Sequence, residues 1–112
     1  MDIANLKEQV EIYIAKLQEI TNKYWSDNNF THSPAPRIEM TEGNRYLKIL
    51  SNKYNFTGKS EGGSVHTFID RTNGNILKAG TFKAPAANGV RGNIFSADFE
   101  NCVNAHGAKY LR

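Results

Sequence analysis

Length, composition and charge already exclude several classes of protein. The chain has 112 residues, 39% hydrophobic and 22% charged, with a formal net charge of +3, which fits a single domain. It contains no apolar run long enough to cross a membrane, and its N-terminus lacks a basic-then-apolar signal. We therefore expect a cytoplasmic protein with neither a membrane span nor export. The single cysteine, Cys102, excludes an internal disulfide.

The charges are unevenly distributed along the chain. Residues 1–36 carry three basic and five acidic groups, whereas residues 37–112 carry eleven basic and six acidic groups. Such a basic excess favours a polyanionic or phosphorylated partner, although a solvated surface would have the same composition.

An amphipathic helix is predicted from Asp2 to about Trp25. Apolar residues recur there at spacings of three and four, which places them on one face of a helix. They are Ile3, Leu6, Val10, Tyr13, Ile14, Leu17, Ile20 and Tyr24. Ile12 lies on the opposite face, either as a single exposed isoleucine or as part of a subunit contact.

Two hairpins are predicted over residues 37–80, after a polar connection at residues 26–36. The first spans residues 37–54 and turns at residues 42–44, and the second spans residues 65–79 and turns at Asn73-Gly74. Residues 58–63 read as a mobile loop between them. A long helix packed on a small antiparallel sheet gives the class α+β.

Residues 81–112 are predicted to be a loop-rich ligand segment and C-terminal segment, in which residues 101–112 offer one short strand to close the sheet. The chain thus reads as one domain over 1–112, with the helix at 1–25 and the sheet at 37–80. Loops beside a rigid sheet are where binding groups concentrate.

Several chemistries are not supported by the spacing of the residues. Gly58-Lys59-Ser60 lacks the earlier glycine and the following helix of a P-loop. His32, His66 and His106 are far apart in sequence, so no metal site is expected. Cys102 lies near His106 but reads as a small buried apolar residue. We therefore expect no catalytic residue, no metal and no cofactor.

The segment from Phe82 to Phe95 contains the parts of a nucleotide site. The two phenylalanines offer faces for stacking a base, and Lys83 and Arg91 offer donors to phosphate. Asn93 can donate and accept hydrogen bonds, and glycines such as Gly92 leave backbone N–H groups near an anion. In the competing interpretation the phenylalanines belong to the core, Arg91 pairs with Asp98 or Glu100, and Asn93 caps a turn.

Longer stretches carry a resemblance to known proteins. Residues Phe68–Ala79, Phe82–Ala86, Val90–Phe95 and Gly107–Arg112 together resemble a group of small bacteriophage proteins with a helix before a small sheet. The phenylalanine and Arg-Gly-Asn positions resemble those of the Thoeris anti-defence sponges. Those phage proteins sequester cyclic ADP-ribose-type immune signals without degrading them, and they form oligomers with ligand sites between subunits.

The resemblance implies a role for four of the candidate residues. Phe82 would stack on the base, Arg91 and Asn93 would bind phosphate and ribose, and Arg112 would reach in from a neighbouring chain. The expected function is then sequestration of a cyclic ADP-ribose-type or cyclic oligonucleotide signal by a homo-oligomer in the infected bacterial cell. Two alternatives remain: a nucleic-acid-binding phage accessory protein and a phage protein that binds a host factor.

Overall fold

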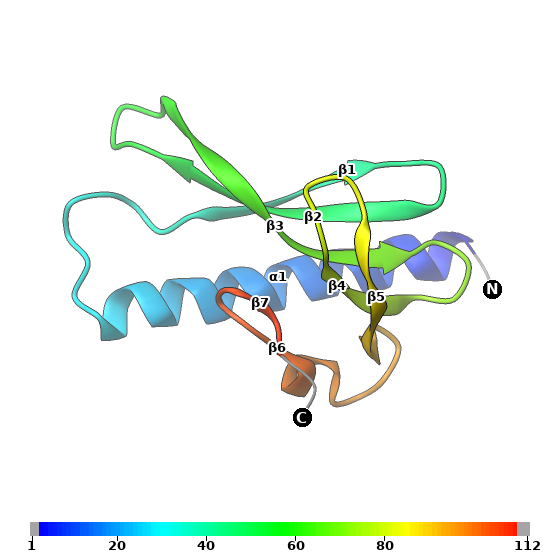
Figure 1. The fold of residues 1–112 in the computed structure, drawn as a ribbon. Helices are drawn as coiled ribbons and strands as arrows, with labels where there is room; N and C mark the ends of the chain where they lie inside the picture. Colours follow the sequence, from blue (N-terminus) through cyan, green and yellow to red (C-terminus); the bar gives the residue numbers. More distant parts are fainter. Residues whose placement is uncertain (1–2, 110–112) are drawn as a thin grey trace.

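One long helix precedes a sheet in the computed structural model, which describes residues 3–109. The elements are α1 (Ile3–Asp27), β1 (Arg37–Glu42), β2 (Tyr46–Tyr54), β3 (Ser60–Asp70), β4 (Asn75–Ala79), β5 (Pro85–Asn93), the 3-10 helix η1 (Phe99–Cys102), β6 (Val103–Asn104) and β7 (Gly107–Ala108). Figure 1 shows α1 running along one face of the sheet. The class is therefore α+β.

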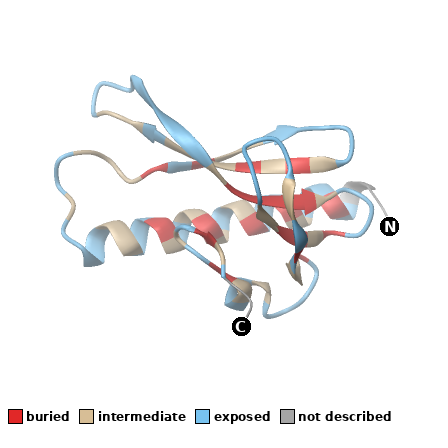
Figure 2. Cartoon of the chain, viewed as in Figure 1, coloured by how far each residue is buried: buried red, intermediate tan, exposed pale blue. Residues whose placement is uncertain are grey.

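The predicted apolar stripe of α1 forms one half of the core. Leu6, Val10, Tyr13 and Leu17 are all buried, and Figure 2 shows the buried segments of helix and sheet facing each other. The helix continues to Asp27, two residues beyond the predicted end. It stops there because Asn29 adopts a left-handed conformation with φ of 55°, a common way to end a helix.

The main sheet is antiparallel, with five strands in the order β1-β2-β3-β4-β5. Leu47 of β2 lies opposite Ile69 of β3, and Ile69 lies opposite Ile76 of β4. All three are buried and pack in the same core as α1. Because side chains alternate along a strand, the residues between them point to the other, outer face of the sheet.

The prediction of two hairpins ending near residue 80 is incomplete, because a fifth strand follows. In the pairing of β5 with β4, Leu77 lies opposite Val90 and Ala79 lies opposite Pro85. The stretch between Pro85 and Val90 therefore bulges out of the ladder, and Asn88 takes a φ of 57°. This inserted turn interrupts the alternation of side chains, which is why the sequence reads as a loop there.

Two further expectations are corrected by the structure. The loop predicted at residues 58–63 is shorter, because β3 begins at Ser60 and pairs with Tyr54. The C-terminal segment does not close the main sheet: Val103 pairs with Ala108, so β6 and β7 form a small sheet of their own. We call residues 103–108 the C-terminal hairpin.

β3 carries one extra residue at the point where it faces α1. Ile49 and Leu50 are neighbours in β2, but their partners Thr67 and Val65 are two residues apart in β3. His66 is therefore the inserted residue of a β-bulge, and such bulges re-aim side chains. His66 and Thr67 are both buried, although simple alternation would place them on opposite faces.

Candidate functional site

The structure divides the predicted ligand residues between two places. Arg91, Gly92 and Asn93 line a pocket of about 220 Å³ beside Cys102. Phe82 and Lys83 lie instead in the turn between β4 and β5. There the Phe82 ring lies 4.1 Å from Nζ of Lys48, on the outer face of the sheet. Arg112 lies outside the described residues.

The side chains of Arg91 and Asn93 make hydrogen bonds within the protein. Arg91 Nε donates to the carbonyl oxygen of Lys109 at 2.9 Å, and its Nη1 donates to that of Asn88 at 2.6 Å. Asn93 Nδ2 donates to the carbonyl oxygen of Asn73 at 2.8 Å. Arg91 thus ties β5 to the C-terminal segment, and Asn93 ties β5 to the turn between β3 and β4.

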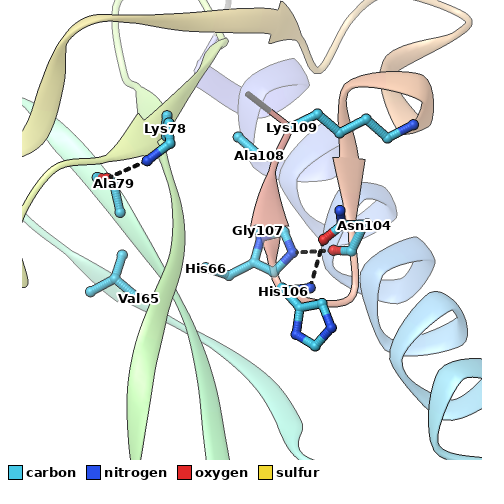
Figure 3. Close-up of a pocket in the computed structure, with 9 residues that line it drawn as sticks. All are labelled: Val65, His66, Lys78, Ala79, Asn104, His106, Gly107, Ala108 and Lys109. Atoms are coloured by element: carbon cyan, nitrogen blue, oxygen red, sulfur yellow. Dashed lines mark hydrogen bonds between the residues drawn. The ribbon is translucent and has the colours of Figure 1, made fainter. Parts of the chain in front are cut away.

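A larger cleft, of about 460 Å³, lies between the sheet and the C-terminal hairpin. Val65 and Ala79 line it from β3 and β4, and Asn104 and Ala108 line it from the hairpin. Figure 3 shows the lining residues of β3 and β4 on one side and those of the C-terminal hairpin on the other. Its volume is in the range of small-molecule sites, roughly 300–1,000 Å³.

The charge of this cleft is of one sign. Its lining includes the basic residues Lys78 and Lys109 and the histidines His66 and His106, and none of its described lining residues is acidic. Lys78 is half-buried and Lys109 is exposed. Two lysines beside low-dielectric walls create a positive potential, which attracts anions. The cleft is therefore suited to a small anionic ligand.

A chain of hydrogen bonds fixes the wall of the cleft at His66. Its Nε2 lies 2.7 Å from the carbonyl oxygen of Asn104, and a carbonyl only accepts, so Nε2 carries the proton. Nδ1 of the neutral ring then accepts from the Thr67 hydroxyl at 3.1 Å. That hydroxyl in turn accepts from the Tyr13 phenol at 2.7 Å. One directed chain thus links α1, β3 and the C-terminal hairpin.

Burial keeps this chain neutral. It lowers the pKa of the His66 imidazole below its ordinary value of 6.5, because the charged ring would lose its hydration. Burial also raises the pKa of the Tyr13 phenol, which remains a donor at neutral pH. A second proton on His66 would occupy Nδ1 and displace the hydrogen bond from Thr67.

The sequence prediction missed the residues of this cleft. His66 and His106 are far apart in sequence, yet both line the cleft, because β7 runs beside β3 with Gly107 next to the His66 carbonyl. The one sequence feature that pointed toward an anion site was the excess of basic residues after residue 36, and this excess does not say which residues form the site. Within residues 3–109, the His, Cys, Asp and Glu side chains form no group of three or more that could hold a metal ion.

Comparison with known proteins places the chain in a family without assigning an activity. No curated protein matches it significantly, and no solved structure does so either. In the part of the chain that the structure describes, no helix is long and apolar enough to cross a membrane. One family model matches residues 1–110. The chain therefore belongs to DUF7717, a family of unknown function.

Proposed function

We propose that this protein binds a small phosphate-bearing ligand of the nucleotide class in the cleft between the sheet and the C-terminal hairpin, and holds it without converting it. The observation that carries the proposal is the set of cationic and imidazole groups around the cleft, without an acidic side chain among its described lining residues. Lysine ammonium groups are effective point charges toward phosphate.

The apolar part of the lining supports a ligand that is more than an inorganic anion. Val65, Ala79 and Ala108 contribute aliphatic surface beside the charged groups. Small-molecule sites commonly combine such surface with a few polar groups that fix orientation. A nucleotide offers both an uncharged body and a phosphate, so it matches both parts of this lining.

Binding without catalysis fits the state of the reactive groups. Both ring nitrogens of His66 are engaged within the protein, so this imidazole does not serve as a general base. Burial raises the pKa of the Cys102 thiol, which therefore stays protonated and is a poor nucleophile. Cys102 also lines a different pocket.

The resemblance to phage sponges suggests the specific form of this function. We favour sequestration of a cyclic ADP-ribose-type or cyclic oligonucleotide signal by a homo-oligomer in the cytoplasm of an infected bacterial cell. Cyclic ADP-ribose isomers and cyclic dinucleotides therefore belong among the probes, beside ADP, ATP and pyrophosphate.

Titration calorimetry with these probes tests the proposal. Lys109→Ala removes one cation of the cleft, and Lys59→Ala removes the same charge from the turn before β3. A hydrogen bond to a charged group contributes about 1.5–3 kcal/mol. Lys109→Ala should therefore weaken binding by about 10- to 100-fold, while Lys59→Ala should bind like the parent. Equal affinities of the parent and Lys109→Ala for every probe would refute the proposed site.

A second candidate function is supported by the outer face of the sheet. Three cations lie over aromatic rings there, at 4.9 Å for Arg37 and Tyr54, 5.2 Å for Arg45 and Tyr46, and 4.1 Å for Lys48 and Phe82. Exposed rings and cations on a sheet are typical of single-stranded nucleic-acid binding. An oligonucleotide released steeply by salt would favour this function, since counterion release scales with the number of phosphates contacted.

A further inference from the structure

A third pocket, of about 340 Å³, lies where the end of α1 meets the connection to β1. We call it the aromatic pocket, because five of its lining residues carry aromatic rings. They are Tyr24, Trp25, Phe30, His32 and His106. Of these five, the function proposed above uses only His106, which also lines the cleft.

The rings are arranged edge to face rather than stacked. Trp25 and Phe30 are 4.6 Å apart at 62°, and Tyr24 and His106 are 4.8 Å apart at 80°. The contacts of His32 with Trp25 and Phe30 are also inclined, at 46° and 72°. In an edge-to-face pair the ring that presents its edge keeps both of its faces clear of its partner, so a flat ligand ring can stack on it.

Hydroxyl groups also line the aromatic pocket, from Thr21, Ser51 and Ser64. Thr21 is only 3% exposed, and its Oγ1 has no hydrogen-bond partner among the described residues. Leaving a buried hydroxyl unpaired is unfavourable. A ligand with donors and acceptors on its edge would provide partners for such groups, which an aliphatic ligand would not.

The aromatic pocket shares a lining residue with the cleft between the sheet and the C-terminal hairpin, which we call the cationic cleft. His106 lines both, and the neighbouring residues Ser64 and Val65 of β3 line one each. The aromatic pocket thus supplies flat rings, hydroxyl-bearing residues and Lys53, the cleft supplies Lys78 and Lys109, and His106 is common to both. These two sets match the base and the phosphate of a nucleotide.

We propose that the aromatic pocket binds the base of a nucleotide whose phosphate lies in the cationic cleft. This inference rests on the proposed function for the phosphate end and adds the recognition of a purine or pyrimidine ring. The base stacks on the rings beside Trp25, the hydroxyl groups bind its edge, and His106 lies between base and phosphate.

Trp25 is the only tryptophan of the chain, so its fluorescence reports directly on the aromatic pocket. Adenosine, guanosine and uridine carry a base without phosphate, pyrophosphate carries phosphate without a base, and the nucleoside diphosphates carry both. We expect at least one nucleoside to quench Trp25. The matching diphosphate should bind at least tenfold more tightly than that nucleoside, because it occupies both parts of the site.

Variants separate the two parts. Phe30→Leu keeps an apolar side chain but removes a ring, and Thr21→Val removes the unpaired hydroxyl while keeping the shape. Phe56→Leu makes the same ring-to-aliphatic change on an exposed side chain that does not line the pocket. We expect Phe30→Leu to weaken nucleoside binding about tenfold or more, and Thr21→Val to weaken it as well. Phe56→Leu should bind like the parent, and pyrophosphate should bind all three variants equally.

The failures of the two proposals are distinguishable. One result would overturn the base site and leave the phosphate site standing. In that result, diphosphate binding depends on Lys109 but does not change Trp25 fluorescence, and Phe30→Leu and Thr21→Val bind the diphosphate as tightly as the parent does. Nucleoside binding without any pyrophosphate binding overturns the phosphate site. Thermal melts identify a variant that fails to fold, and the near-isosteric Thr21→Val keeps the test decisive if Phe30→Leu does not fold.

Discussion

The hydrogen-bond chain from Tyr13 through Thr67 to His66 makes a quantitative prediction about stability. Thr67→Val keeps the shape of the side chain but removes the central oxygen, which accepts from Tyr13 and donates to His66. Tyr13 and Thr67 are fully buried, so water does not replace the lost partners. Because an unpaired buried group costs about 1–3 kcal/mol, we expect Thr67→Val to lower the free energy of unfolding by about 2–4 kcal/mol.

Tyr13→Phe should have a smaller effect. It removes the first donor, but Thr67 keeps its hydrogen bond to His66, so we expect a loss of about 0.5–1.5 kcal/mol. The double variant lacks the Tyr13 hydroxyl that Thr67→Val alone leaves unpaired. Its loss in the free energy of unfolding should therefore not exceed the loss in Thr67→Val. Urea denaturation of the four proteins measures this directly. Additive losses, or a larger loss for Tyr13→Phe than for Thr67→Val, would refute the directed chain.

Four further predictions address other features. Because the pKa of His66 in the folded protein lies below 6.5, the unfolded chain binds more protons than the folded protein below that pH. The free energy of unfolding should therefore fall on acidification from pH 7 to 5, by at most about 1.4 kcal/mol per pH unit. His66→Gln should show a weaker pH dependence. In Gly92→Ala the new Cβ would lie 2.7 Å from Cys102 Sγ, so we expect a loss of about 1–3 kcal/mol in urea titrations, relieved by Cys102→Ala. Phe82 is 59% exposed, so Phe82→Ala should change the melting temperature little; a loss of about 3–5 kcal/mol would place it in the core. Ile12 is 52% exposed on α1; if it forms the predicted subunit contact, Ile12→Glu should reduce the mass measured by light scattering, and a monomeric parent would exclude that contact.

The helix and the first four strands could be predicted because their side chains follow simple periods. Leu6, Val10 and Leu17 mark one helix face, and Leu47 and Ile49 mark one face of β2. These patterns depend only on local geometry, which the sequence records directly. β5 escaped prediction because the turn at Asn88 interrupts its alternation.

The candidate site was harder to predict because it depends on contacts between distant segments. Thr67 and Asn104 become linked only because the bulge at His66 turns the imidazole toward the C-terminal hairpin. No periodicity in the sequence indicates such a bulge. β6 and β7 have two residues each, which is too short for a recognisable strand pattern.

The length of β3 also affects how the protein avoids unwanted assembly. β4 pairs only with Thr67, Phe68 and Ile69 of β3, so the stretch from Ser60 to Ser64 extends beyond its neighbour, as Figure 1 shows. An open strand edge invites pairing with another chain. Here that stretch carries the charge of Glu61 and two glycines, and Gly62 takes a φ of 95°. The irregular backbone and the charge make the edge a poor template for a further strand, so β3 can extend past β4 without promoting aggregation.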